Sequence, residues 1–67
     1  MSVLSRLTER ERAVAVAVGR GRGNAEIARE LFLSIATVKQ HVSSVLLKLD
    51  LNNRTQIALL AHDAGLT

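Results

Sequence analysis

The fold is decided by the stretch Ser34-Ile35-Ala36-Thr37-Val38-Lys39-Gln40-His41-Val42-Ser43-Ser44-Val45-Leu46-Leu47-Lys48-Leu49. Its large apolar residues recur at the spacing of one helix face; they are Val38, Val42, Val45, Leu46 and Leu49. Ser34 is a natural N-cap because its hydroxyl can accept a hydrogen bond from an otherwise unpaired backbone N–H. The pattern therefore predicts an amphipathic helix that begins after Ser34 and ends near Leu49.

The opposite and flanking faces of this helix carry no carboxylate. They present a cation, an amide, two hydroxyls and a methyl group, which belong to Lys39, Gln40, Ser43, Ser44 and Ala36. The polar groups can bond to phosphates or to base edges in the major groove of DNA. A plain solvated face would carry similar residues, so this stretch alone leaves both interpretations open.

Length and composition limit the classes of protein that fit. The chain has 67 residues and no cysteine, so it is one small domain without disulfides or thiolate metal sites. Phe32 is the only Phe, Tyr or Trp, which argues against a stacking surface for single-stranded nucleic acid. The net charge of +3 and the pI near 10.7 modestly favour a polyanionic partner. No transmembrane run of roughly 20 apolar residues and no signal peptide are visible, so we expect a cytoplasmic protein.

A first helix is predicted from Thr8 to about Gly19. Thr8 and Glu11, three residues apart, form a capping box, in which each side chain bonds to the backbone N–H of the other residue. The strict Ala-Val alternation over residues 13–18 is a strand-like period, and valine favours strands. The capping box and the alanines favour a helix, and we choose the helix.

A second helix is predicted over residues 24–31, after a connector with three glycines in five residues. Two arginines in this connector could bind phosphate, although a solvated connector is the preferred interpretation. Only two residues separate Leu31 from the Ser34 cap. The second and third helices must therefore meet at a steep angle, as in a helix-turn-helix. Ala28 is expected at their closest crossing, where a larger side chain would force them apart.

A fourth helix is predicted from Arg54 to about Ala64. Asp50 is expected to take the left-handed conformation that ends the third helix, and Asn53 can cap the fourth. Its inner face should consist of Ile57, Ala58 and Ala61. Leu59 and Leu60 are too many leucines for one core stripe, so at least one should lie near the surface. Arg54 is expected to have a structural role, although contact with the end of the third helix or with a phosphate is also open.

The predicted fold class is all-α: a four-helix domain containing a helix-turn-helix, as a single domain over 1–67 with its core at about 4–66. Paired catalytic carboxylates, cysteine and nucleophile–base spacings are absent, so we expect neither an enzyme nor a cofactor. No second histidine or carboxylate lies one turn from His41, so no metal site is expected. A partly buried His41 that reaches a phosphate is the preferred interpretation.

Five short motifs follow one another at fixed separations along nearly the whole chain. They are Leu7-Thr8-Glu9-Arg10-Glu11, Asn24-Ala25-Glu26-Ile27-Ala28, Ser34-x-x-Thr37-Val38-Lys39-x-His41-Val42, Lys48-Leu49 and Asn53-Arg54. This order resembles the LuxR-type helix-turn-helix family, which includes the DNA-binding output domains of NarL/FixJ-type two-component response regulators. The resemblance implies a transcriptional regulator that binds double-stranded DNA with its third helix in the major groove.

The resemblance also implies roles for individual residues. The base-facing positions match Lys39, Gln40 and Ser43. The positions that approach the DNA backbone match Thr37, His41 and Asn24. Ser44, from the acid-free helix face, completes the expected DNA-binding set. The family commonly dimerises through the fourth helix, whose surface here would include Leu59, Leu60 and Asp63.

Two questions about partners follow from this resemblance. We expect a homodimer, as is common in the family, and RNA polymerase as a further partner. The alternative is a helical protein-interaction module similar to region 4 of sigma factors, since Leu47, Leu59 and Leu60 leave room for a protein partner. The chain is too short to contain a phosphoacceptor or ligand-binding domain as well. We therefore expect an output domain of a longer regulator or a small standalone one.

Overall fold

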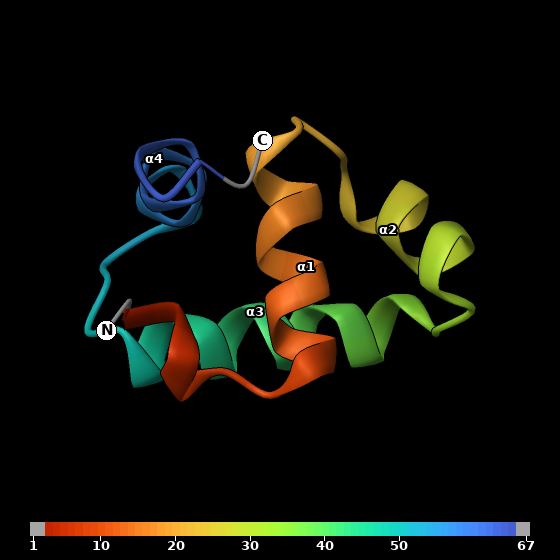
Figure 1. Ribbon diagram of the computed structural model, residues 1–67. Coiled ribbons are helices and arrows are strands. Elements are labelled where there is room, and N and C mark those ends of the chain that lie inside the picture. The colour runs from red at the N-terminus through yellow and green to blue at the C-terminus, as the bar shows by residue number, and fades with distance from the viewer. Residues whose placement is uncertain (1–2, 66–67) are drawn as a thin grey trace.

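The computed structural model describes residues 3–65, and in this range the chain forms one short 3-10 helix and four α-helices. They are η1 (Val3–Arg6), α1 (Glu9–Gly19), α2 (Asn24–Leu31), α3 (Ile35–Lys48) and α4 (Arg54–Asp63). In Figure 1, α1 stands across α3, with α2 and α4 on its two sides. The predicted all-α class with a helix-turn-helix is confirmed. The single turn of η1 was not predicted, because four residues are too few to show a helical period.

The start of α1 is fixed by the predicted capping box. The Glu11 backbone N–H donates to the Thr8 hydroxyl at 3.1 Å, and the Thr8 N–H donates to the Glu11 carboxylate at 2.8 Å. The alternating segment that follows is helical, with Val14, Ala15, Ala17 and Val18 all buried. This helix packs against both α3 and α4, so it buries a wide arc of its circumference. A wide buried arc explains why the segment lacks the narrow apolar stripe of an ordinary surface helix.

The turn between α2 and α3 has the predicted length, but its conformation was not predicted. Phe32 adopts a left-handed conformation with φ 58°, and the Leu33 N–H donates to the Ala28 carbonyl at 2.8 Å. Sequence patterns mark such a residue when it is glycine or asparagine, and Phe32 is neither. The Ser34 hydroxyl then accepts the Thr37 N–H at 3.0 Å and begins α3. Ala28 is buried in the core, as expected for a residue at the crossing of α2 and α3.

The end of α3 and the start of α4 follow the prediction closely. Asp50 has φ 55°, which is the left-handed conformation expected of it. The Leu51 N–H donates to the Leu46 carbonyl at 2.8 Å, which closes the last turn of α3 in the manner of a Schellman motif. The Asn53 side chain accepts the Gln56 N–H at 3.1 Å and caps α4.

The hydrophobic core lies where α1, α2, α3 and α4 face one another. Its largest fully buried side chains are Ile27, Ile57, Val14, Val38 and Val45. The rest of the predicted α3 stripe packs against this core as partly buried residues, namely Val42, Leu46 and Leu49. The predicted inner face of α4 is also confirmed, with Ile57 and Ala61 buried and Ala58 partly buried. With its inner stripe anchored in this way, α3 presents its other side to solvent.

Candidate nucleic-acid interface

The outer face of α3 is an exposed row of polar side chains. Lys39, Gln40 and Ser43 are all exposed. Among residues 3–65, none of these three side chains forms a hydrogen bond or an ion pair. Leu47, four residues beyond Ser43, continues the row and is 83% exposed. The sequence predicted this face as a cation, an amide and a hydroxyl directed outward, and the geometry agrees for these three residues.

Thr37 and His41 lie beside this row, and both are half-buried. The Ser34 hydroxyl donates to the Thr37 hydroxyl oxygen at 2.9 Å. Because the Thr37 oxygen acts as an acceptor in this bond, its own proton is left to donate elsewhere. A phosphate oxygen is an acceptor of the kind this proton needs. The expected partial burial of His41 is confirmed, whereas its contact with a phosphate stays a prediction.

Ser44 has a different environment from that of its neighbour Ser43. It is half-buried, and its hydroxyl donates to the Glu11 carboxylate of α1 rather than pointing outward. Lys48, one turn further along α3, donates to the same carboxylate at 2.7 Å. Neither of these two partners of Glu11 was predicted from the sequence. The DNA contact expected of Ser44 stays a prediction, and it would compete with the bond to Glu11.

Glu11 is therefore a buried carboxylate whose charge is well compensated. The hydrogen bond from Lys48, then that from Ser44 and the Thr8 N–H, hold the pKa of Glu11 at about 2, below its ordinary 4.5. Burial of the carboxylate works in the opposite direction but does not prevail. The residue is only 5% exposed. This network ties α3 to α1 at the C-terminal half of α3, and so it helps to fix the direction of the outer row.

The start of α2 is joined to the start of α4 by Arg54. One guanidinium nitrogen, Nη1, donates to the Asn24 side-chain oxygen, and Nη2 donates to the Arg22 carbonyl at 2.7 Å. Arg54 forms the intramolecular contacts expected of a structural residue, but its partners lie in the connector before α2 and at the start of α2, not at the end of α3. The Arg22 side chain forms an ion pair with Glu30 at 2.9 Å. Two contacts of Arg22 therefore fix the connector between α1 and α2. Its carbonyl accepts a hydrogen bond from Arg54, and its side chain pairs with Glu30.

The expected dimer surface lies on α4. Leu59 is 60% exposed, Leu60 is half-buried and Asp63 is exposed. The expectation that at least one of the two leucines lies near the surface is confirmed. His62 Nε2 of α4 and the Gly19 carbonyl oxygen lie 2.9 Å apart, which links α4 to the end of α1. Dimerisation itself stays a prediction.

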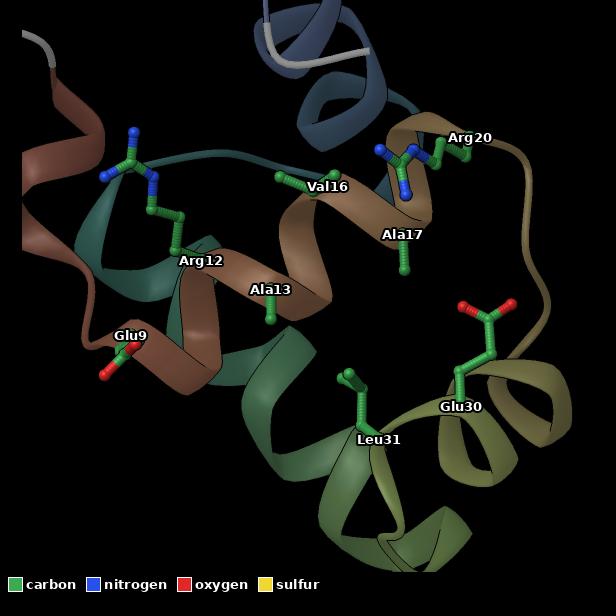
Figure 2. A pocket seen from close by; sticks show the side chains of 8 residues that line it. All are labelled: Glu9, Arg12, Ala13, Val16, Ala17, Arg20, Glu30 and Leu31. Carbon is green, nitrogen blue, oxygen red and sulfur yellow. The ribbon is translucent and has the colours of Figure 1, made fainter.

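A hollow of about 350 Å³ lies between α1 and α2. Figure 2 shows its lining, which has an apolar part, Ala13, Val16, Ala17 and Leu31, and a charged part, Glu9, Arg12, Arg20 and Glu30. None of the expected DNA-binding or dimer residues contributes to it. Among residues 3–65, no three His, Cys, Asp or Glu side chains group as a metal site. None of the helices described is both long enough and apolar enough to cross a bilayer.

Comparison with known proteins agrees with this geometry. A family model described as bacterial regulatory proteins, luxR family, matches residues 5–61. The chain belongs to this family. As a luxR-family domain whose third helix exposes its outer face, it is a DNA-binding domain of a transcriptional regulator.

Several curated relatives are similar to the chain over most of its length. The transcriptional regulatory protein LiaR of Bacillus subtilis is 46% identical over 56 residues, which are 84% of this chain and 26% of LiaR. The uncharacterized transcriptional regulatory protein YhcZ of the same organism is 50% identical over 56 residues, again 84% of this chain and 26% of the relative. The response regulator protein VraR of Staphylococcus aureus is 42% identical over 60 residues, 90% of this chain and 29% of VraR. The chain thus spans little more than a quarter of the length of these relatives.

Proposed function

We propose that this luxR-family domain recognises a specific double-stranded DNA sequence by inserting α3 into the major groove. The observation that carries the proposal is the exposed row of Lys39, Gln40 and Ser43, whose side chains bond to nothing else among residues 3–65. α3 has 14 residues and is therefore about 21 Å long, enough to reach several successive base pairs. Its buried stripe keeps this row directed away from the core.

Each DNA-binding residue has a proposed role that follows from its chemistry. Lys39 can donate to guanine O6 and N7, while the Gln40 amide can pair with adenine and the Ser43 hydroxyl can bond to any base edge. Thr37, His41 and Asn24 would bond to phosphates and fix the register of the domain on the duplex. Ser44 would act mainly through Glu11, because its hydroxyl already donates to that carboxylate.

We further propose that two copies bind together through α4. Leu59 and Leu60 supply apolar area on this helix, and the exposed Asp63 lies at its end. A two-fold dimer would place its half-sites about one helical turn of DNA apart. The similarity to the longer proteins LiaR and the response regulator VraR favours a longer regulator with this chain as its output domain. Such a regulator would act in the cytoplasm on the chromosome.

We also propose that the domain contacts RNA polymerase when it is bound to DNA. Phe32, in the turn between α2 and α3, is 95% exposed, and Ile35, the first residue of α3, is 47% exposed. We propose that these apolar side chains contact the polymerase while α3 occupies the groove. Replacing Phe32 with serine should then lower transcription from a bound promoter while DNA affinity is retained. Equal transcription by the parent and the variant would remove the Phe32 contact from the proposal.

The central experiment is selection of bound sites from a random double-stranded DNA library, followed by binding titrations over a salt series. A selected motif with paired half-sites is the expected outcome. Lys39→Met should weaken binding to that motif by about tenfold, since a good base contact contributes about 1–3 kcal/mol. Gln40→Ala should relax the preference at one base position without unfolding the domain.

Arg29→Met is the matched control, because Arg29 is an exposed arginine on α2 outside the α3 row. It should retain the motif and nearly all of the affinity. Binding that depends neither on salt nor on Lys39 would exclude the DNA proposal and would favour the protein-interaction alternative.

A further inference from the structure

We infer that Arg54 is a positioning residue that turns the Asn24 amide toward the DNA backbone. The inference rests on the proposed contact between Asn24 and a phosphate, and it adds the reason why Asn24 is prepared for that contact. It also assigns to the first turn of α4 a function in DNA binding that is separate from dimerisation.

The hydrogen bond between the two side chains decides which end of the amide is left for DNA. Arg54 Nη1 donates to Asn24 Oδ1, so the acceptor end of the amide faces the guanidinium. An asparagine amide has one acceptor oxygen and an NH₂ group with two donors. Because Asn24 Oδ1 accepts from the Arg54 guanidinium, the two N–H groups of the amide remain available to donate to an anion. The reversed amide would present its oxygen to a phosphate and would be repelled.

The guanidinium can hold this orientation because it is itself fixed. Arg54 Nη2 donates to the Arg22 backbone carbonyl at 2.7 Å. The planar fork of arginine is thereby anchored at two points, and a lysine ammonium could not reproduce that geometry. Arg54 and Asn24 are both half-buried, which limits the freedom of the pair.

The helix dipole of α2 favours an anion beside Asn24. Asn24 is the first residue of α2, where the aligned peptide dipoles leave a partial positive charge. The Glu26 carboxylate accepts the Gly23 N–H at 3.0 Å, which holds the residue before Asn24 in place but also brings a negative charge to this helix start. Arg54 is the first residue of α4. A displacement of α4 would therefore move the partner that orients Asn24, which connects the expected dimer helix to the backbone contact.

Four proteins test the inference on the DNA site selected above: the parent, Asn24→Ala, Arg54→Met and the double variant. Each single change should weaken binding per half-site by about three- to tenfold, the range of one hydrogen bond. The double variant should bind DNA as tightly as the single variant with the lower affinity. The two losses should not add, because Arg54 acts through Asn24. The slope of log affinity against log salt should stay the same in all four, since a neutral amide displaces no counterion. Arg29→Met, on the exposed side of α2, is the control for loss of an arginine charge.

Three results would overturn the inference, and they are distinguishable. If Arg54 bonds directly to a phosphate, Arg54→Met lowers the salt slope by about 0.9 and weakens binding further in the Asn24→Ala protein. If Arg54 only supports the fold, Arg54→Met lowers Tm but leaves the affinity of the folded protein unchanged. If Asn24→Ala binds like the parent, the phosphate contact of Asn24 fails and the inference fails with it, while the α3 part of the proposed function stands.

If Arg54→Met folds poorly, Arg54→Lys provides a second test of whether Arg54 orients the Asn24 amide. It retains the charge but not the two-point fork, so it should lose affinity to a similar extent at an unchanged salt slope. Full retention of affinity by Arg54→Lys would show that charge, rather than orientation of the amide, is what matters, and would overturn the inference.

Discussion

Replacing Glu11 with glutamine should destabilise the domain by about 2 kcal/mol at neutral pH. At about 1.4 kcal/mol for each pKa unit, the drop of the Glu11 pKa from 4.5 to about 2 corresponds to about 3 kcal/mol. The Lys48 side chain is 38% exposed, so solvent screens part of the attraction and the smaller figure is expected. In a domain of this size, such a loss lowers Tm by about 10 °C.

The pH dependence of this effect has a definite sign. Because the pKa of Glu11 is lower in the folded protein, the unfolded chain binds protons more readily between pH 4.5 and about 2. The stabilisation by Glu11 is therefore complete above about pH 4.5 and is lost as the pH falls toward 2. Glutamine at position 11 does not titrate, so the stability difference between parent and variant should shrink over the same window.

Urea unfolding followed by far-UV circular dichroism at pH 7, 4.5, 3 and 2 measures this difference directly. Glu9→Gln is the matched control, because Glu9 lies in the same first turn of α1 but is exposed. It should change stability by no more than about 0.5 kcal/mol. A Glu11→Gln protein that loses stability on acidification as steeply as the parent would refute the assignment of a strongly lowered pKa to Glu11.

Other predictions concern the core, the ends of the helices and the surface of α4. Val38 is fully buried, so Val38→Ala should cost about 2 kcal/mol in urea unfolding, through lost burial and a residual cavity. Asp50 has a positive φ, so Asp50→Gly should raise stability by about 1 kcal/mol, and a Tm at or below that of the parent would contradict this. Leu59 is 60% exposed, so Leu59→Lys should change the stability of the monomer by less than about 0.5 kcal/mol. The same change should weaken binding to paired half-sites more than to one, and equal losses on both DNAs would remove Leu59 from the dimer contact.

The sequence predicted the helices well where local chemistry defines their ends. The capping box of Thr8 and Glu11, the Ser34 and Asn53 caps and the left-handed Asp50 all depend on residues within a few positions of one another. Phe32 was missed because its left-handed conformation is imposed by the meeting of α2 and α3, not by its own preference.

The sequence predicted which side chains of α3 point outward. It did not predict the hydrogen bonds that join the residues of the interface to other helices. A helical wheel places Lys39, Gln40 and Ser43 outward, and the structure agrees. The same wheel leaves Ser44 on a flank, and only the packing of α1 against α3 brings the Glu11 carboxylate to its hydroxyl. The bond between Arg54 and Asn24 spans 30 positions in sequence, so no local pattern could reveal it.

The separation between the anchored and the exposed sides of α3 has a consequence for how such regulators diversify. Val38 and Val45 hold the helix in the core, whereas Lys39, Gln40 and Ser43 take no part in holding the described residues together. Substitutions in the exposed row therefore meet little resistance from folding, and gene copies can acquire new operator preferences one residue at a time. A library randomised at these three positions should contain mostly folded proteins, which makes the domain a suitable scaffold for retargeting a genetic circuit.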